Sequence, residues 1–163
     1  MKIEVIREGS GTYKVKASAT VRASHRSVLD MFLRRECTTK FRDVKGCPSW
    51  EPQADGSVLA RYEMKPPSID FDMHVRKRDS HAIEFWTPPD VAGAWCDIRG
   101  AWKIHPVFFG LTHVSLDQTI LIKSAWLRMI PIQSLIKGRI KNVFEDMHDS
   151  NTGFFGRLFS CFR

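Results

Sequence analysis

Alternation of apolar and polar side chains predicts β-strands over most of the chain. Between residues 12 and 22 the apolar side chains occupy every second position, which is typical of a strand buried on one face. Similar runs cover about residues 46–53, 58–65, 69–76, 82–86, 95–105 and 113–123, and turn residues such as Gly, Pro and Asp separate them. The pattern therefore predicts an antiparallel sheet of about seven strands, each with one apolar face.

Two other segments repeat apolar residues every three or four positions, which predicts helices. A short helix from about Ser24 to Glu36 follows the first strand, and Ser24 is its expected N-cap. The longest element is a C-terminal helix from about Arg128 to Asp149, in which Pro131 suits the first turn. Gly138 lies in the middle of this helix, where glycine is unfavourable. One explanation is a close approach of the helix to the sheet or to a ligand. The other is an exposed position at which a glycine is tolerated.

The order of these elements predicts one α+β domain over residues 1–149. Strands with a single apolar face need a cover on that face only, and a sheet of this size twists and curls. The C-terminal helix has an apolar stripe wide enough to fill the hollow. We therefore expect a curved antiparallel sheet wrapped around that helix, followed by an aromatic and basic tail over residues 150–163.

Three passages of the sequence resemble the START-like or helix-grip superfamily, including its polyketide cyclase/dehydrase and coenzyme Q-binding branches. The first passage, VRASHRSVLDMF (Val21–Phe32), resembles the family's connection from its first strand into its first helix. The second, FRDVKGCPSWEPQADGSVLARYEM (Phe41–Met64), resembles the hairpin that follows in the family. The closing helix is similar to MIPIQSLIKGRIKNVFEDM (Met129–Met147). The resemblance covers roughly residues 13–148. It implies a cavity for a lipid, isoprenoid, polyketide or similar apolar molecule, and does not identify that molecule.

The inward faces of the predicted elements supply a candidate ligand-binding set. Methionine suits irregular apolar pockets, and ligand sites combine apolar walls with a few polar groups. The set is Tyr62, Met64, Phe71, Met73, Phe85, Trp102, Leu116, Gln118, Ile120, Ile136, Ile140, Val143, Phe144 and Met147. A solidly packed core explains the same pattern, and the resemblance favours a cavity.

Gln118 is the polar member of an otherwise apolar row on its strand. A buried amide without partners costs about 1–3 kcal/mol, so the side chain needs either a ligand carbonyl or hydroxyl or a neighbouring backbone group. The hydroxyl of Tyr62 poses the same question.

Two apolar segments lie where a domain of this kind is expected to be polar. One is the predicted hairpin tip at residues 107–111, which we expect to pack, and the other is the tail. Exposed segments of this sort mark contact with a membrane or a partner, and folded back they cover the core. The candidate contact residues are Phe108, Phe109, Phe154, Phe155, Leu158 and Phe159.

Composition narrows the class of protein. The net charge of +7 favours anionic partners such as an acidic membrane surface, although the basic residues are scattered rather than clustered. With 43% hydrophobic and 26% charged residues the chain is typical of a soluble globular protein, and it shows neither a signal peptide nor a transmembrane run. Its four cysteines lack disulfide or zinc spacing, which suggests reduced thiols in the cytoplasm or another intracellular compartment.

The sequence contains no motif for a metal ion, a nucleotide cofactor or a hydrolase nucleophile, so we expect neither metal nor cofactor and favour binding over catalysis. The enzymatic alternative is a cyclase- or dehydrase-like reaction in the same cavity. Asp97, Arg99 and His105 share a strand face opposite Trp102, and a register slip of one residue would turn that face inward.

A second alternative is binding of a protein or nucleic acid on the basic convex face of the sheet, where Trp50 and Trp86 would supply stacking surfaces. The absence of an RNP or helix-turn-helix signature disfavours nucleic acid. The sequence gives no indication of oligomeric state.

Overall fold

The computed structural model describes residues 1–66, 70–89, 94–108 and 110–149. The elements in chain order are β1 (Lys2–Arg7), β2 (Thr12–Val21), α1 (His25–Leu33), the 3₁₀ helix η1 (Arg35–Lys40), β3 (Val44–Pro52), β4 (Val58–Met64), β5 (Phe71–Lys77), β6 (Ala82–Trp86), β7 (Cys96–Phe108), β8 (Leu111–Ile122), the 3₁₀ helix η2 (Leu127–Met129) and α2 (Ile132–Asp149).

The strands form one 8-stranded antiparallel sheet in the order β1-β2-β8-β7-β6-β5-β4-β3. Most neighbours are hairpin partners, and the pairing of β2 with β8 joins the two ends of the chain. The predicted α+β architecture, a curved sheet with a long C-terminal helix, is confirmed. The strand missing from the prediction is β1, in which only Ile3 and Val5 alternate toward the core while Ile6 is exposed.

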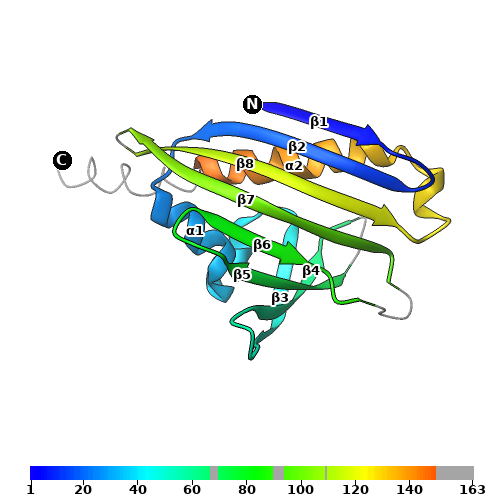
Figure 1. Cartoon of the computed structure of the whole chain (residues 1–163), viewed down its shortest axis with the longest axis horizontal. Helices are drawn as coiled ribbons and strands as arrows, with labels where there is room; N and C mark the ends of the chain where they lie inside the picture. The colour runs from blue at the N-terminus through cyan, green and yellow to red at the C-terminus, as the bar shows by residue number, and fades with distance from the viewer. Residues whose placement is uncertain (67–69, 90–93, 109, 150–163) are drawn as a thin grey trace.

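The long helix α2 lies against the concave side of the sheet, where Figure 1 shows it running behind β2 and β8. Its buried apolar residues recur at intervals of three or four positions, as the amphipathic pattern predicts: Ile132, Ile136, Ile140, Phe144 and Met147. The short helix α1 lies on the other flank, against β5 and β7. The apolar face of the sheet is therefore covered by two helices rather than by α2 alone.

Local side-chain chemistry fixes where the first helix begins. The Ser24 hydroxyl accepts a hydrogen bond from the backbone N–H of Ser27 at 3.1 Å, which satisfies one of the free donors of the first turn and confirms the predicted N-cap. Val28 and Met31 are then buried beneath the helix. The predicted helix divides into α1 and η1, because Arg34 adopts an extended backbone between them.

The C-terminal half of α2 is anchored by a buried carboxylate. Asp146 accepts a hydrogen bond from the backbone N–H of Arg42 at 2.7 Å and another from the Arg42 side chain, Nε to Oδ1, at 2.6 Å. The hydrogen bond to Asp146 raises the pKa of the Arg42 guanidinium. These bonds hold the last turns of α2 against the connection between η1 and β3.

The glycines of α2 and β7 give a first test of the packing. An added methyl group at Gly138 would meet no atom within 4 Å, so Gly138→Ala should raise the free energy of unfolding by about 0.5–1 kcal/mol in denaturant titrations. At Gly100 the same group would lie 2.5 Å from the carbonyl oxygen of Asp117, and Gly100→Ala should lower that free energy by about 1–3 kcal/mol. Changes of the same sign would contradict the packing described above.

Candidate functional site

A cavity of about 290 Å³ lies between the concave face of the sheet and α2. This volume is at the lower end of the range of about 300–1,000 Å³ typical of small-molecule sites. The structure places around it most of the predicted ligand-binding set, namely Tyr62, Met64, Phe71, Met73, Phe85, Trp102, Leu116, Gln118, Ile120, Ile136, Ile140 and Val143. The interior is therefore not filled throughout by side chains.

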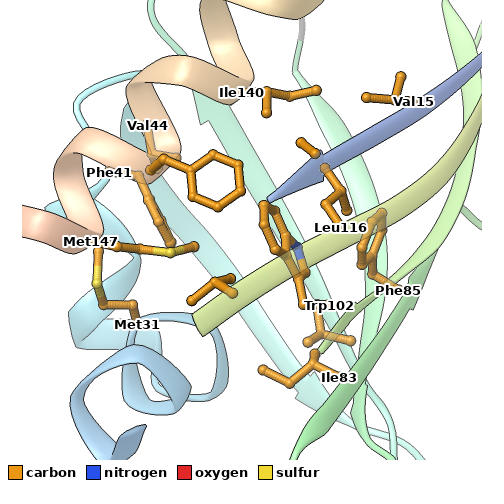
Figure 2. Packing of buried hydrophobic residues seen from close by; sticks show 14 of the residues in the cluster. Val15, Met31, Phe41, Val44, Ile83, Phe85, Trp102, Leu116, Ile140 and Met147 are labelled. Atoms are coloured by element: carbon orange, nitrogen blue, oxygen red, sulfur yellow. The ribbon is translucent and has the colours of Figure 1, made fainter. Parts of the chain in front are cut away.

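Phe144 and Met147 belong to the packed core instead of the cavity wall, which corrects their predicted position. They are 2% and 0% exposed, and the ring of Phe144 meets Trp102 edge-on at a centroid distance of 5.7 Å. Figure 2 shows Met147 on the side of the core where Met31 and Phe41 lie. The physical reason is the Asp146 anchor, which holds the last turns of α2 against the connection between η1 and β3.

Other lining residues are absent from the predicted set. Some follow the same strand alternation and were available from it: Val75, Ile83, Cys96, Ile98 and Ile122. Others come from the two helices and from the segments next to β3 and α2, namely Phe32, Phe41, Val44, Leu127, Ile132 and Leu135. Phe32, Ile132 and Leu135 belong to the apolar repeats of the two predicted helices and were available in the same way. For Phe41, Val44 and Leu127 sequence periodicity gave no signal, because it does not show how a connection folds over a sheet.

The charged side chains of the lining neutralise each other. Asp43 and Arg139 form an ion pair, Oδ1 to Nη1, at 3.0 Å, and Asn142 donates from Nδ2 to the other Asp43 oxygen at 3.0 Å. Arg139 also donates from Nη2 to the carbonyl oxygen of Lys65 at 2.9 Å. These contacts tie the middle of α2 to the β3–β4 hairpin, and they join residues too distant in sequence for a local motif to reveal them.

An opening of the cavity is indicated between α2 and the strands β4 and β5. Half-buried apolar residues of the lining belong to these elements, with Met64, Phe71 and Met73 on the sheet side and Leu135 and Val143 on the helix side. The Asp43–Arg139 pair lies in the same wall and keeps about a fifth of each side chain exposed. Charge thus sits where solvent can reach it, and the deeper wall is apolar.

Gln118 is a polar exception in the deeper wall. Its neighbours on the inward face, Val15 across the β2 ladder and Leu116 and Ile120 along β8, are buried, so the amide faces the cavity. Among the residues that the structure describes, no group hydrogen-bonds to this amide. The alternative in which a neighbouring backbone group satisfies it is therefore not what the structure shows.

Tyr62 contributes a second neutral polar group. Its ring lies 5.8 Å from that of Phe71 and is 7% exposed. Burial raises the pKa of the phenol well above its usual range, so the hydroxyl keeps its proton at physiological pH. No side chain or backbone group within the described ranges hydrogen-bonds to this hydroxyl.

The candidate catalytic residues lie outside the cavity. The β7–β8 register pairs Ile98 with Ile120, and both line the cavity, so Asp97 and Arg99 point to the opposite face of the sheet. Asp97 is bound by Lys123 there at 2.8 Å. The slipped register that would have turned Asp97 and Arg99 inward is wrong.

The aromatic residues of the proposed nucleic-acid surface already have partners. Trp86 is stacked on His74 at a centroid distance of 5.2 Å, and the guanidinium of Arg76 lies 5.2 Å from the centre of the Trp86 ring. Trp50 packs against the hydrophobic core. Both rings therefore already make contacts within the protein, which disfavours their use as stacking platforms for bases.

The β7–β8 hairpin tip is exposed, contrary to the expectation that it packs. Val107 is 59% and Phe108 66% exposed, because β7 continues past β6, whose pairing with it stops at Ala82 and Lys103. The other predicted contact residues, Phe109, Phe154, Phe155, Leu158 and Phe159, lie outside the described residues. None of the helices formed by the described residues has the length and apolar character that a membrane crossing requires.

Solved structures of other proteins share this architecture. The human StAR-related lipid transfer protein 5 superposes with a TM-score of 0.68 at 13% identity over 94% of this chain and 88% of its own. A START superfamily protein from Mycobacterium smegmatis does so with a TM-score of 0.61 at 18% identity over 89% and 98%. The di-domain ARO/CYC BexL of the BE-7585A biosynthetic pathway gives 0.68 at 10% identity over 89% of this chain, which spans 52% of that protein's length.

No protein-family model matches the sequence, and no curated protein matches it. At these levels of identity the superpositions establish the fold. The chain has the START-like helix-grip fold, as the three sequence passages predicted.

Cys96 reports on access to the cavity. Burial raises the pKa of its thiol to about 11, with a further contribution from the Asp97 carboxylate. Since the thiolate is the reactive form, iodoacetamide at pH 8 should modify Cys96 roughly a hundredfold more slowly than an ordinary thiol of pKa about 8.5. The rate should rise between pH 8 and 11 as the thiolate forms. Peptide mass spectrometry gives the rate, and the same peptide in unfolded protein is the control. Equal rates in folded and unfolded protein at pH 8 would contradict the burial of Cys96 in the cavity wall.

Proposed function

We propose that this protein binds a hydrophobic small molecule, such as a lipid or isoprenoid, in the cavity between the sheet and α2, and carries it between membranes. The observation that supports this most directly is the cavity itself, because apolar side chains form nearly all of its wall. Closing it by tighter packing would gain contact energy, so an unfilled apolar volume in a folded domain is typical of a ligand site.

The comparisons add support of a general kind. Two of the proteins that superpose on this chain are named for lipid transfer: StAR-related lipid transfer protein 5 and the StarD13 lipid transfer and protein localization domain. The ARO/CYC proteins show that the fold also occurs in biosynthetic pathways. Binding without catalysis is favoured for this chain, because Asp97 and Arg99 lie on the outer face and the charged lining residues are paired with each other.

Filling the cavity should abolish binding. Val143→Trp places a large side chain at the indicated opening and should weaken binding of the neutral fluorescent probe Nile red at least tenfold, because the indole occupies the volume that the probe needs. Lys137→Trp, on the exposed face of the same helix, is the matched control and should bind as the parent protein does. Thermal melting shows whether each variant is folded. Parent-like binding by a folded Val143→Trp protein would argue against this cavity as the site.

The mass of a bound lipid would identify the ligand class directly. Native mass spectrometry of the protein incubated with extracted lipids should show a mass increase that disappears in Val143→Trp. An identical mass increase in both proteins would mean that the lipid binds elsewhere.

Transfer requires contact with a membrane, and we propose the exposed hairpin tip and the tail for it. Phe108 is exposed beside Val107, and the net charge of +7 favours an anionic surface. Phe108→Ser, or deletion of residues 153–163, should reduce sedimentation with phosphatidylserine-containing vesicles several-fold. Leu121→Ser, which also changes an exposed apolar residue, is the control. Unchanged sedimentation of both test proteins would remove these segments from the membrane contact.

A further inference from the structure

The polar groups of the cavity specify the chemistry of the ligand more narrowly than its apolar wall does. Building on the proposed binding function, we propose that the ligand is an electrically neutral, mostly apolar molecule with a carbonyl or hydroxyl group that binds Gln118 inside the cavity. Three observations carry this inference: the paired charges, the unsatisfied amide and the space that Gly100 leaves beside it.

The charged side chains of the wall offer no single charge for an ionic ligand. Asp43 has one oxygen on Arg139 and the other on Asn142, and Arg139 also binds the carbonyl oxygens of Lys65 and Pro66. An anionic head group that approached Arg139 would be repelled by Asp43. A cationic head group that approached Asp43 would be repelled by Arg139. Moving an unpaired charge into an apolar interior is strongly unfavourable, so an ionic head has no favourable position in the deeper cavity.

Gln118, by contrast, is placed to bind a neutral group. A primary amide both donates and accepts hydrogen bonds, so it matches a carbonyl, which accepts, and a hydroxyl, which does both. Its flanking residues on β8 are Leu116 and Ile120, which are apolar and buried, and the part of the chain that the structure describes provides no partner for it. A ligand group that binds the amide therefore adds a hydrogen bond that the described residues do not supply.

Gly100 makes the room for this side chain. It faces Gln118 across the β7–β8 ladder on the inward side, and a Cβ at position 100 would lie 2.6 Å from the Cβ of Gln118. Any other residue would press on the Cα and Cβ of Gln118 or displace the strand. The glycine therefore lets β7 lie close to β8 at the position of the glutamine.

The volume limits the size of the ligand. At about 290 Å³ the cavity suits a molecule no larger than a typical drug, and this is too small to enclose a phospholipid with two acyl chains. A single-chain alcohol, a ketone or a compact cyclic molecule with one oxygen function meets both the volume and the polarity of the site.

Competition among matched single-chain compounds tests the charge preference. Dodecanol, 2-dodecanone, dodecanoate and dodecylammonium share an apolar chain and differ at one end. At pH 7.5 and below their micelle concentrations, the alcohol and the ketone should displace Nile red with dissociation constants at least tenfold lower than those of the two ions. Equal affinity for dodecanoate would overturn the inference, because it would show that the charged end is tolerated or remains at the opening.

A variant of Gln118 tests the contact itself. Gln118→Leu should weaken binding of dodecanol and 2-dodecanone about two- to tenfold, since a hydrogen bond of this kind contributes roughly 0.5–1.5 kcal/mol. Binding of dodecane, which has no polar end, should be unchanged or tighter. Gly138→Ala, whose added methyl group meets no atom within 4 Å, is the control for these three compounds and should match the parent protein.

The two proposals fail in different ways. If no apolar compound binds the folded parent protein, the proposed function is wrong and the inference falls with it. If the compounds bind but Gln118→Leu weakens dodecane and dodecanol equally, the cavity is the site and only the assigned role of Gln118 is wrong. Thermal melting of Gln118→Leu ensures that a loss of binding reflects the missing amide and not unfolding.

Discussion

The structure depends on one geometric constraint: α2, with only the short helix α1 beside it, must cover the apolar face of an 8-stranded sheet. A helix with its side chains is only about 10–12 Å across, so it cannot contact every part of a curved face of that width. Near its C-terminal end α2 packs tightly, where Asp146 binds Arg42 and Phe144 meets Trp102. Toward its middle and its start the sheet curves away, and the space between the two layers is the cavity.

The arrangement separates charge from apolar surface in a consistent way. The outer face of β7 carries Asp97 in an ion pair with Lys123, and the inner face of the same strand carries Ile98 and Trp102. Where charge does enter the lining, at Asp43 and Arg139, it is paired and partly exposed. Gln118, like the Tyr62 hydroxyl, is a neutral polar group of the wall to which none of the described residues hydrogen-bonds. Because its amide both donates and accepts, it dominates the chemistry that we assign to the ligand.

Much of this fold was predictable because periodicity records which face of an element is buried. The run from Thr12 to Val21 alternates clearly, and its strand appeared where expected. What periodicity does not record is where along a buried face the packing is complete. Phe144 and Val143 are adjacent on the same amphipathic helix, yet one lies in solid core and the other lines the cavity. The ion pair of Asp43 with Arg139 was likewise hidden, because it depends on how the helix crosses the sheet.

The ladder between β2 and β8 has a consequence for how the chain acquires its structure. It pairs Thr12 with Leu121 and Val21 with Thr112, so the centre of the sheet joins segments from opposite halves of the polypeptide. Contacts of such long sequence separation are slow to form, because a large loop must close before they yield any energy. During synthesis β2 must wait, unpaired on that edge, until β8 has emerged. The hollow interior is consequently a late product of folding, absent until the closing strand and the helix after it have docked.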